Sequence, residues 1–97
     1  MWRVILLVIA ALNFLLAAYM WFAPLAWYDG TPGVAMMGPF NLHFIRDVGL
    51  AYLTSAAALS WGAWKRDVAA AVFGAAWPCL HALFHIWIWL GRGVPFD

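Results

Sequence analysis

Two pairs of metal-ligating side chains stand four residues apart in this chain: His43 with Asp47, and His81 with His85. Residues four apart on an α-helix lie on one face, so both members of each pair can reach the same ligand. Imidazole and carboxylate groups bind Zn, Cu or Fe, and an imidazole can also bind the metal of a haem or a pigment. The spacing therefore predicts a site for a transition metal or a metal-centred cofactor.

The segments that carry these pairs are too apolar for the surface of a soluble protein. Hydrophobic residues make up 68% of the 97 residues and charged residues only 9%, whereas about a quarter of a soluble domain is charged. The net charge of +1 and the lack of a basic stripe exclude a nucleic-acid surface. The composition predicts an integral membrane protein, in which ionisable residues are costly and mark functional sites.

Three stretches are long and apolar enough to cross a bilayer core of about 30 Å, which takes roughly 20 helical residues. They cover residues 2–22, 40–64 and 67–90. We therefore expect an all-α, multi-pass protein that forms a single domain, 1–97, with three transmembrane helices. The first stretch is longer than the apolar core of a typical signal peptide and is predicted to be a retained anchor.

The distribution of basic residues predicts how these spans are oriented. Arg3, Lys65 and Arg66 fall on one side of the membrane and Arg92 falls on the other, and basic residues concentrate in cytoplasmic loops. We expect the N-terminus in the cytoplasm and the C-terminus outside the cell inner (plasma) membrane. Tryptophans near the ends of the spans are typical of the aromatic belts at membrane interfaces.

Antiparallel packing of the last two spans is expected to bring the two pairs to one depth. At about 1.5 Å per residue, His43 lies level with His85 and Asp47 lies level with His81, in the outer half of the bilayer. All four residues are therefore predicted metal ligands. His81 and His85 are the principal ligands and the predicted cofactor-binding pair.

Asn13 and Arg46 are expected to support this cluster without binding the metal. Asn13 falls near the depth of Asp47 and is expected to orient an imidazole through its free ring nitrogen. Arg46 precedes Asp47 in the chain, and the two are expected to form an ion pair near the interface. Pro78 lies three residues before His81 and is expected to bend the last helix.

The same cluster admits other functions. It can serve helix packing alone, in which case the protein is a non-catalytic accessory subunit of a larger membrane complex, pigment- or redox-associated. It can also pass protons or solutes, because histidine gains and loses protons near neutral pH. An open metal position would allow redox or hydrolytic chemistry, but no second catalytic group accompanies the cluster, so no catalytic residue is assigned. Three helices enclose little space, which predicts a homo-oligomer or a larger complex in the lipid bilayer.

One segment resembles a known bacterial family. GPFNLHFIRDVGLAYL, residues 38–53, resembles the Arg-Asp-x-Gly segment of DoxX-like small bacterial inner-membrane proteins at Arg46, Asp47 and Gly49. The resemblance implies a location in a bacterial inner membrane. Those proteins typically have four spans, one more than we expect here.

A second segment is similar to a pigment-binding sequence. HALFHIWIWL, residues 81–90, is similar to the pigment-binding end of bacterial light-harvesting β chains, where aromatic residues and an arginine follow a histidine. The resemblance implies that His81 or His85 binds the pigment and that Trp87 and Trp89 accompany it.

Overall fold

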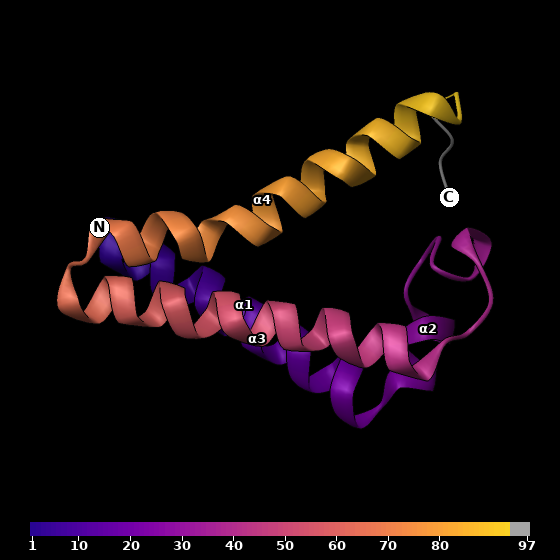
Figure 1. Cartoon of the computed structure of the whole chain (residues 1–97), viewed down its shortest axis with the longest axis horizontal. Helices are drawn as coiled ribbons and strands as arrows, with labels where there is room; N and C mark the ends of the chain where they lie inside the picture. Colours follow the sequence, from indigo (N-terminus) through magenta and orange to yellow (C-terminus); the bar gives the residue numbers. More distant parts are fainter. Residues whose placement is uncertain (94–97) are drawn as a thin grey trace.

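The chain folds almost entirely into helices, as seen in a computed structural model that describes residues 1–93 (Figure 1). The helices are α1 (Trp2–Phe22), α2 (Pro24–Gly30), the short 3-10 helix η1 (Ala35–Met37), α3 (Leu42–Lys65) and α4 (Val68–Gly91). The two short helices, α2 and η1, lie in the connection between α1 and α3. The all-α fold predicted from the sequence is confirmed.

Local capping sets the ends of the long helices. Asn41 caps α3 and Asp67 caps α4, each with a side-chain Oδ1 that accepts a backbone N–H three residues further on, at 3.0 and 3.1 Å. Arg66 ends α3 in the left-handed conformation, with φ of 54°. These caps place both ends of α3 and the start of α4 one or two residues later than in the predicted spans 40–64 and 67–90.

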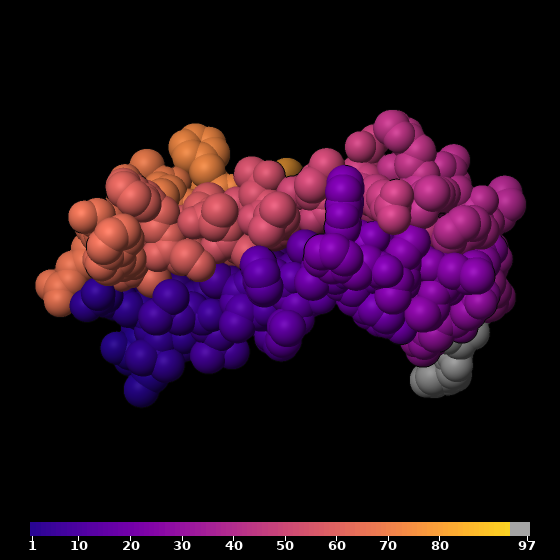
Figure 2. Space-filling view, turned by 90° about the horizontal axis from the view of Figure 1, so that it is seen from below, coloured from indigo at the N-terminus to yellow at the C-terminus, as the bar shows by residue number. Residues whose placement is uncertain are grey.

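α1 and α3 pack side by side along the molecule (Figure 2). A Cβ added at Gly49 would lie 3.3 Å from the Met20 Cβ and 3.5 Å from the Ala17 carbonyl oxygen, so glycine brings the two helices close at this end. At the other end, Arg3 Nε donates a hydrogen bond to the Ala63 carbonyl at 2.7 Å. The two contacts fasten α1 to α3 near both ends.

α3 and α4 approach each other most closely at two glycines. A Cβ added at Gly62 would lie 2.8 Å from the Ala71 backbone N, and one at Gly74 would lie 2.8 Å from the Leu59 backbone N. A side chain at either position would overlap backbone, so glycine permits this approach. Toward its C-terminal end, α4 diverges from α3 (Figure 1). Pro78 lies inside α4 near this divergence and has no N–H to donate to the Gly74 carbonyl.

Much of the apolar surface of the long helices is uncovered. In the most apolar stretch, 22% of α1 and 6% of α4 is buried. Both helices are long and apolar enough to cross a membrane. A helix at the core of a soluble protein would be mostly buried, so the exposure of these two favours a membrane protein.

Replacing Gly74 with alanine is expected to loosen the packing of α4 on α3. The added methyl would overlap the Leu59 backbone N at 2.8 Å, and such overpacking costs about 1–3 kcal/mol. Thermal unfolding in detergent micelles, followed by circular dichroism, should show a lower midpoint temperature. Gly91→Ala is the matched control, because it also replaces a helical glycine and its Cβ would meet nothing within 4 Å. Equal stability of the two variants would contradict the close contact.

Candidate functional site

His81 and His85 lie on one face of α4 and are in direct contact. Their Nε2 atoms are 3.1 Å apart and their ring centroids are 4.5 Å apart. Metal–nitrogen bonds of about 2.0–2.1 Å to two nitrogens at 3.1 Å would meet at an angle of about 98°. That angle lies between those of square-planar and tetrahedral coordination. The two rings are thus at the distance of a hydrogen bond that shares one N–H, and their separation would also suit two ligands of one metal ion.

Aromatic side chains hold His81 where α4 begins to leave α3. The Trp77 ring stacks on His81, with centroids 4.9 Å apart and an interplanar angle of 29°. Tyr52 of α3 meets both rings edge-on, at 5.7 Å from His81 and 5.9 Å from Trp77. His85, one turn further along, is exposed. The site thus has one imidazole fixed by packing and one open to its surroundings.

Tyr52 and Trp77 were not assigned to the site from the sequence. Trp77 precedes His81 by four residues, just as His81 precedes His85, so this spacing alone indicates a row of rings along one face of α4. Tyr52 gave no such signal, because it belongs to another helix and joins the row only through the packing of α3 on α4.

His43 and Asp47 form a separate pair on α3. His43 Nε2 lies 3.1 Å from Asp47 Oδ2, and the two side chains are 89% and 61% exposed. At about 100° per residue, His43 lies about 180° and Asp47 about 140° around α3 from Tyr52, the residue that meets His81. Equal depth therefore does not bring the two pairs together, and no group of three or more His, Cys, Asp or Glu within residues 1–93 could hold a metal ion.

Arg46 and Asn13 contact groups other than the predicted ligands. Arg46 Nε donates to the Trp21 carbonyl at 3.3 Å, and its guanidinium lies 5.2 Å from the centre of the Trp21 ring. The expected ion pair between Arg46 and Asp47 is replaced by these contacts. Asn13 is buried and donates from Nδ2 to the Ile9 carbonyl at 2.8 Å, while its Oδ1 has no partner in the described part of the chain. Within one chain, Asn13 thus does not orient an imidazole.

The chain matches no protein-family model, no curated protein and no solved structure. The resemblances to DoxX-like proteins and to light-harvesting β chains therefore stay predictions, and the function is inferred from the geometry of the chain itself.

Cross-linking of cysteine pairs can test whether Tyr52 and His43 lie on opposite faces of α3. Cys79, which is exposed, is first replaced by serine. A Tyr52→Cys, His81→Cys pair is expected to react with a short bifunctional methanethiosulfonate, because the two native side chains touch. A His43→Cys, His85→Cys pair is expected to stay unlinked, although the sequence places both at one depth. Mass spectrometry of the digested protein measures both yields. Efficient linkage of positions 43 and 85 within one chain would contradict this arrangement.

Proposed function

We propose that the protein is a small, three-span integral membrane protein that holds a transition metal or a metal-centred cofactor on α4. His81 and His85 are the ligands that the chain supplies, and Cu, Zn and Fe all accept imidazole nitrogen. The observation that supports this function best is the 3.1 Å separation of the two Nε2 atoms, which suits two ligands of one ion.

The path of the chain supports three membrane spans. α1 and α4 are each long and apolar enough to cross a membrane, and α3 runs beside both, so it shares their layer. The chain then starts and ends on opposite sides of the bilayer. Lys65, at the end of α3, lies 4.2 Å from the Trp64 ring and 5.6 Å from the Trp61 ring. This group of aromatic and basic residues suits the cytoplasmic interface.

Two imidazoles leave a metal ion with open positions, because structural sites commonly have four ligands and catalytic sites three. His85 is exposed, so further ligands can come from a second copy, from another subunit or from a bound molecule. A haem or pigment needs only one axial imidazole. In that case the exposed His85 is the better ligand, and His81 positions it through their contact. Both versions fit a homo-oligomer or a larger complex.

A second candidate function rests on the uncovered outer half of α4. Its large apolar side chains are exposed over the last two turns and more: Leu83, Phe84, Ile86, Trp87 and Leu90. A partner helix could cover this surface, and the two histidines would then form one hydrogen bond within a packed interface. On this interpretation the protein is a non-catalytic accessory subunit of a larger membrane complex.

The topology predicts which added cysteines can be labelled from each side of the membrane. In a Cys79→Ser background, Lys65→Cys should react with a membrane-impermeant maleimide only after the cytoplasmic face is made accessible. Asp29→Cys, in α2, should react from outside in intact cells, because α2 lies at the opposite end of the α1–α3 pair (Figure 1). Labelling of both positions from the same side would contradict an odd number of spans between them and the proposed orientation.

Metal or cofactor binding predicts a composition and a spectrum. The purified protein should contain stoichiometric metal or show an absorption band of a haem or pigment, and both should be lost in the His81→Ala, His85→Ala double variant. His85→Ala alone should weaken binding by more than the roughly 10–100-fold typical when a group that only orients a ligand is removed. Elemental analysis and absorption spectroscopy measure these losses.

His43→Ala is the matched control for this experiment, because it removes a histidine from the opposite face of α3. It should leave metal content and spectrum unchanged. A colourless, metal-free protein that stays folded through purification would contradict metal binding and would favour the accessory-subunit function.

A further inference from the structure

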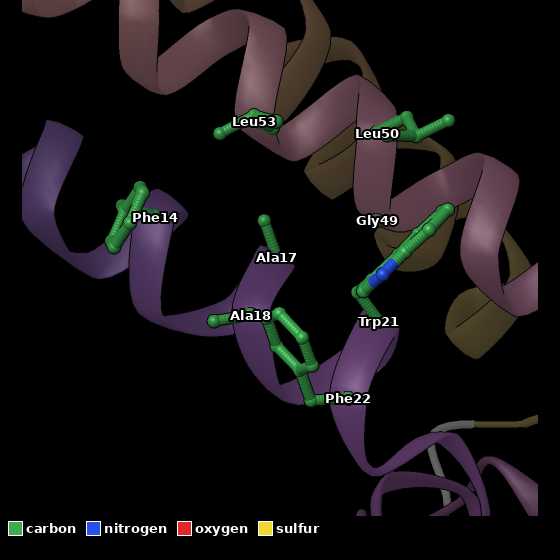
Figure 3. Close-up of a pocket in the computed structure, with 8 residues that line it drawn as sticks. All are labelled: Phe14, Ala17, Ala18, Trp21, Phe22, Gly49, Leu50 and Leu53. Atoms are coloured by element: carbon green, nitrogen blue, oxygen red, sulfur yellow. The ribbon is translucent and has the colours of Figure 1, made fainter.

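Apolar residues of α1 and α3 border a shallow groove between the two helices. Two adjoining hollows, of about 250 and 430 Å³, share Phe14 of α1 and Leu53 of α3 as lining residues. Figure 3 shows the hollow nearer α2, with residues of α1 along one side and residues of α3 along the other. Small residues such as Ala17, Ala18 and Gly49 leave the space that the larger side chains border.

The groove is long enough for a lipid acyl chain. From Leu7 to Trp21 on α1 its lining covers 14 residue steps, or about 21 Å at 1.5 Å per residue. This length exceeds one leaflet of a bilayer core of about 30 Å. The lining is almost wholly apolar, and Ser60 contributes a hydroxyl only at the end far from Trp21.

A positively charged side chain, that of Arg46, lies at the end of the groove nearer the start of α3. Trp21 lines this end, and Arg46 is attached to Trp21 by the hydrogen bond from Nε and by the contact of its guanidinium with the ring. The hydrogen bond to Trp21 uses only Nε, so it leaves the four N–H groups on the Arg46 Nη atoms for another acceptor. The adjacent acid, Asp47, pairs with His43. The contacts with Trp21 therefore hold Arg46 in position and leave its Nη groups for an anion.

We propose that this groove binds an anionic phospholipid, with an acyl chain along the apolar lining and the phosphate on Arg46. The guanidinium presents parallel N–H donors that match phosphate oxygens, and Trp21 fixes its orientation. Arg46 lies about one turn inside α3, so a headgroup at the membrane interface can reach it while its chain follows α1 toward Leu7. The proposal rests on the proposed membrane location and is independent of the metal on α4.

The test uses phosphatidylglycerol that carries a photoactivatable diazirine on one acyl chain, mixed with the full chain in nanodiscs. Cross-links mapped by mass spectrometry are expected in residues 14–22 of α1 and 49–57 of α3. The same probe built on phosphatidylcholine should label these residues about fivefold less, as expected for one arginine near an anionic headgroup. Arg46→Gln should remove this preference.

Two further variants distinguish the contribution of the Arg46 charge to lipid binding from that of the groove. Lys65→Gln removes one positive charge at the opposite end of α3 and should leave the preference unchanged. Ala18→Phe fills the groove and keeps Arg46, so it should abolish cross-linking of residues 14–22 by either probe. Inorganic phosphate should not compete, since a free phosphate lacks the acyl chain, whereas unlabelled phosphatidylglycerol should compete.

Equal labelling by the two lipid probes, or a preference that survives in Arg46→Gln, would overturn the proposal. Circular dichroism of each variant confirms that its helices are intact. Failure of the lipid site is distinguishable from failure of the proposed function. Release of the wild-type protein from membranes by alkaline carbonate would refute the membrane location, and metal content measured on Arg46→Gln reports separately on α4.

Discussion

The close backbone contact of α3 with α4 at Gly62 and Gly74 is the constraint on which the candidate site depends. Inside a bilayer the hydrophobic effect gives helices little reason to associate, so close packing must hold them together. The two glycines place α4 within contact of α3 at Ala71 and Leu59. This contact sets where α4 starts to diverge, and so brings Tyr52 of α3 against His81.

Because α4 diverges from α3, one part of the candidate site is set by α4 itself and the other part by whatever packs beside it. The contact between His81 and His85 depends on one helical turn, so it forms whether or not α4 is covered. The surroundings of His85 depend on what lies beside the C-terminal half of α4, where residues 1–93 provide little cover. Under the proposed function, such a site would have its first two ligands prearranged by α4 and would take its remaining ligands, or its cover, from an assembly.

α3 organises the molecule because it presents different chemistry on different faces. One face packs against α1 through Gly49, and another packs against α4 through Tyr52, Leu59 and Gly62. The face that carries His43 and Asp47 is exposed. Arg46 points toward Trp21 at the end of the α1–α3 groove. Polar residues that stand next to one another in the chain are thus distributed among separate surroundings, and only some of them can act together.

The sequence by itself determined the all-α fold, the three long helices to within one or two residues, and the placement of His43 with Asp47 and of His81 with His85 on one helix face. Each of these follows from local chemistry: apolar length, capping and the 3.6-residue period. The tertiary structure alone decided that the two pairs stay apart and that Arg46 meets Trp21. Residue counting along antiparallel helices gives depth, but the direction in which a side chain points toward a neighbour depends on which faces pack. The glycine contacts of α3 determine which of its faces pack, and as a result His43 and Asp47 face away from α4.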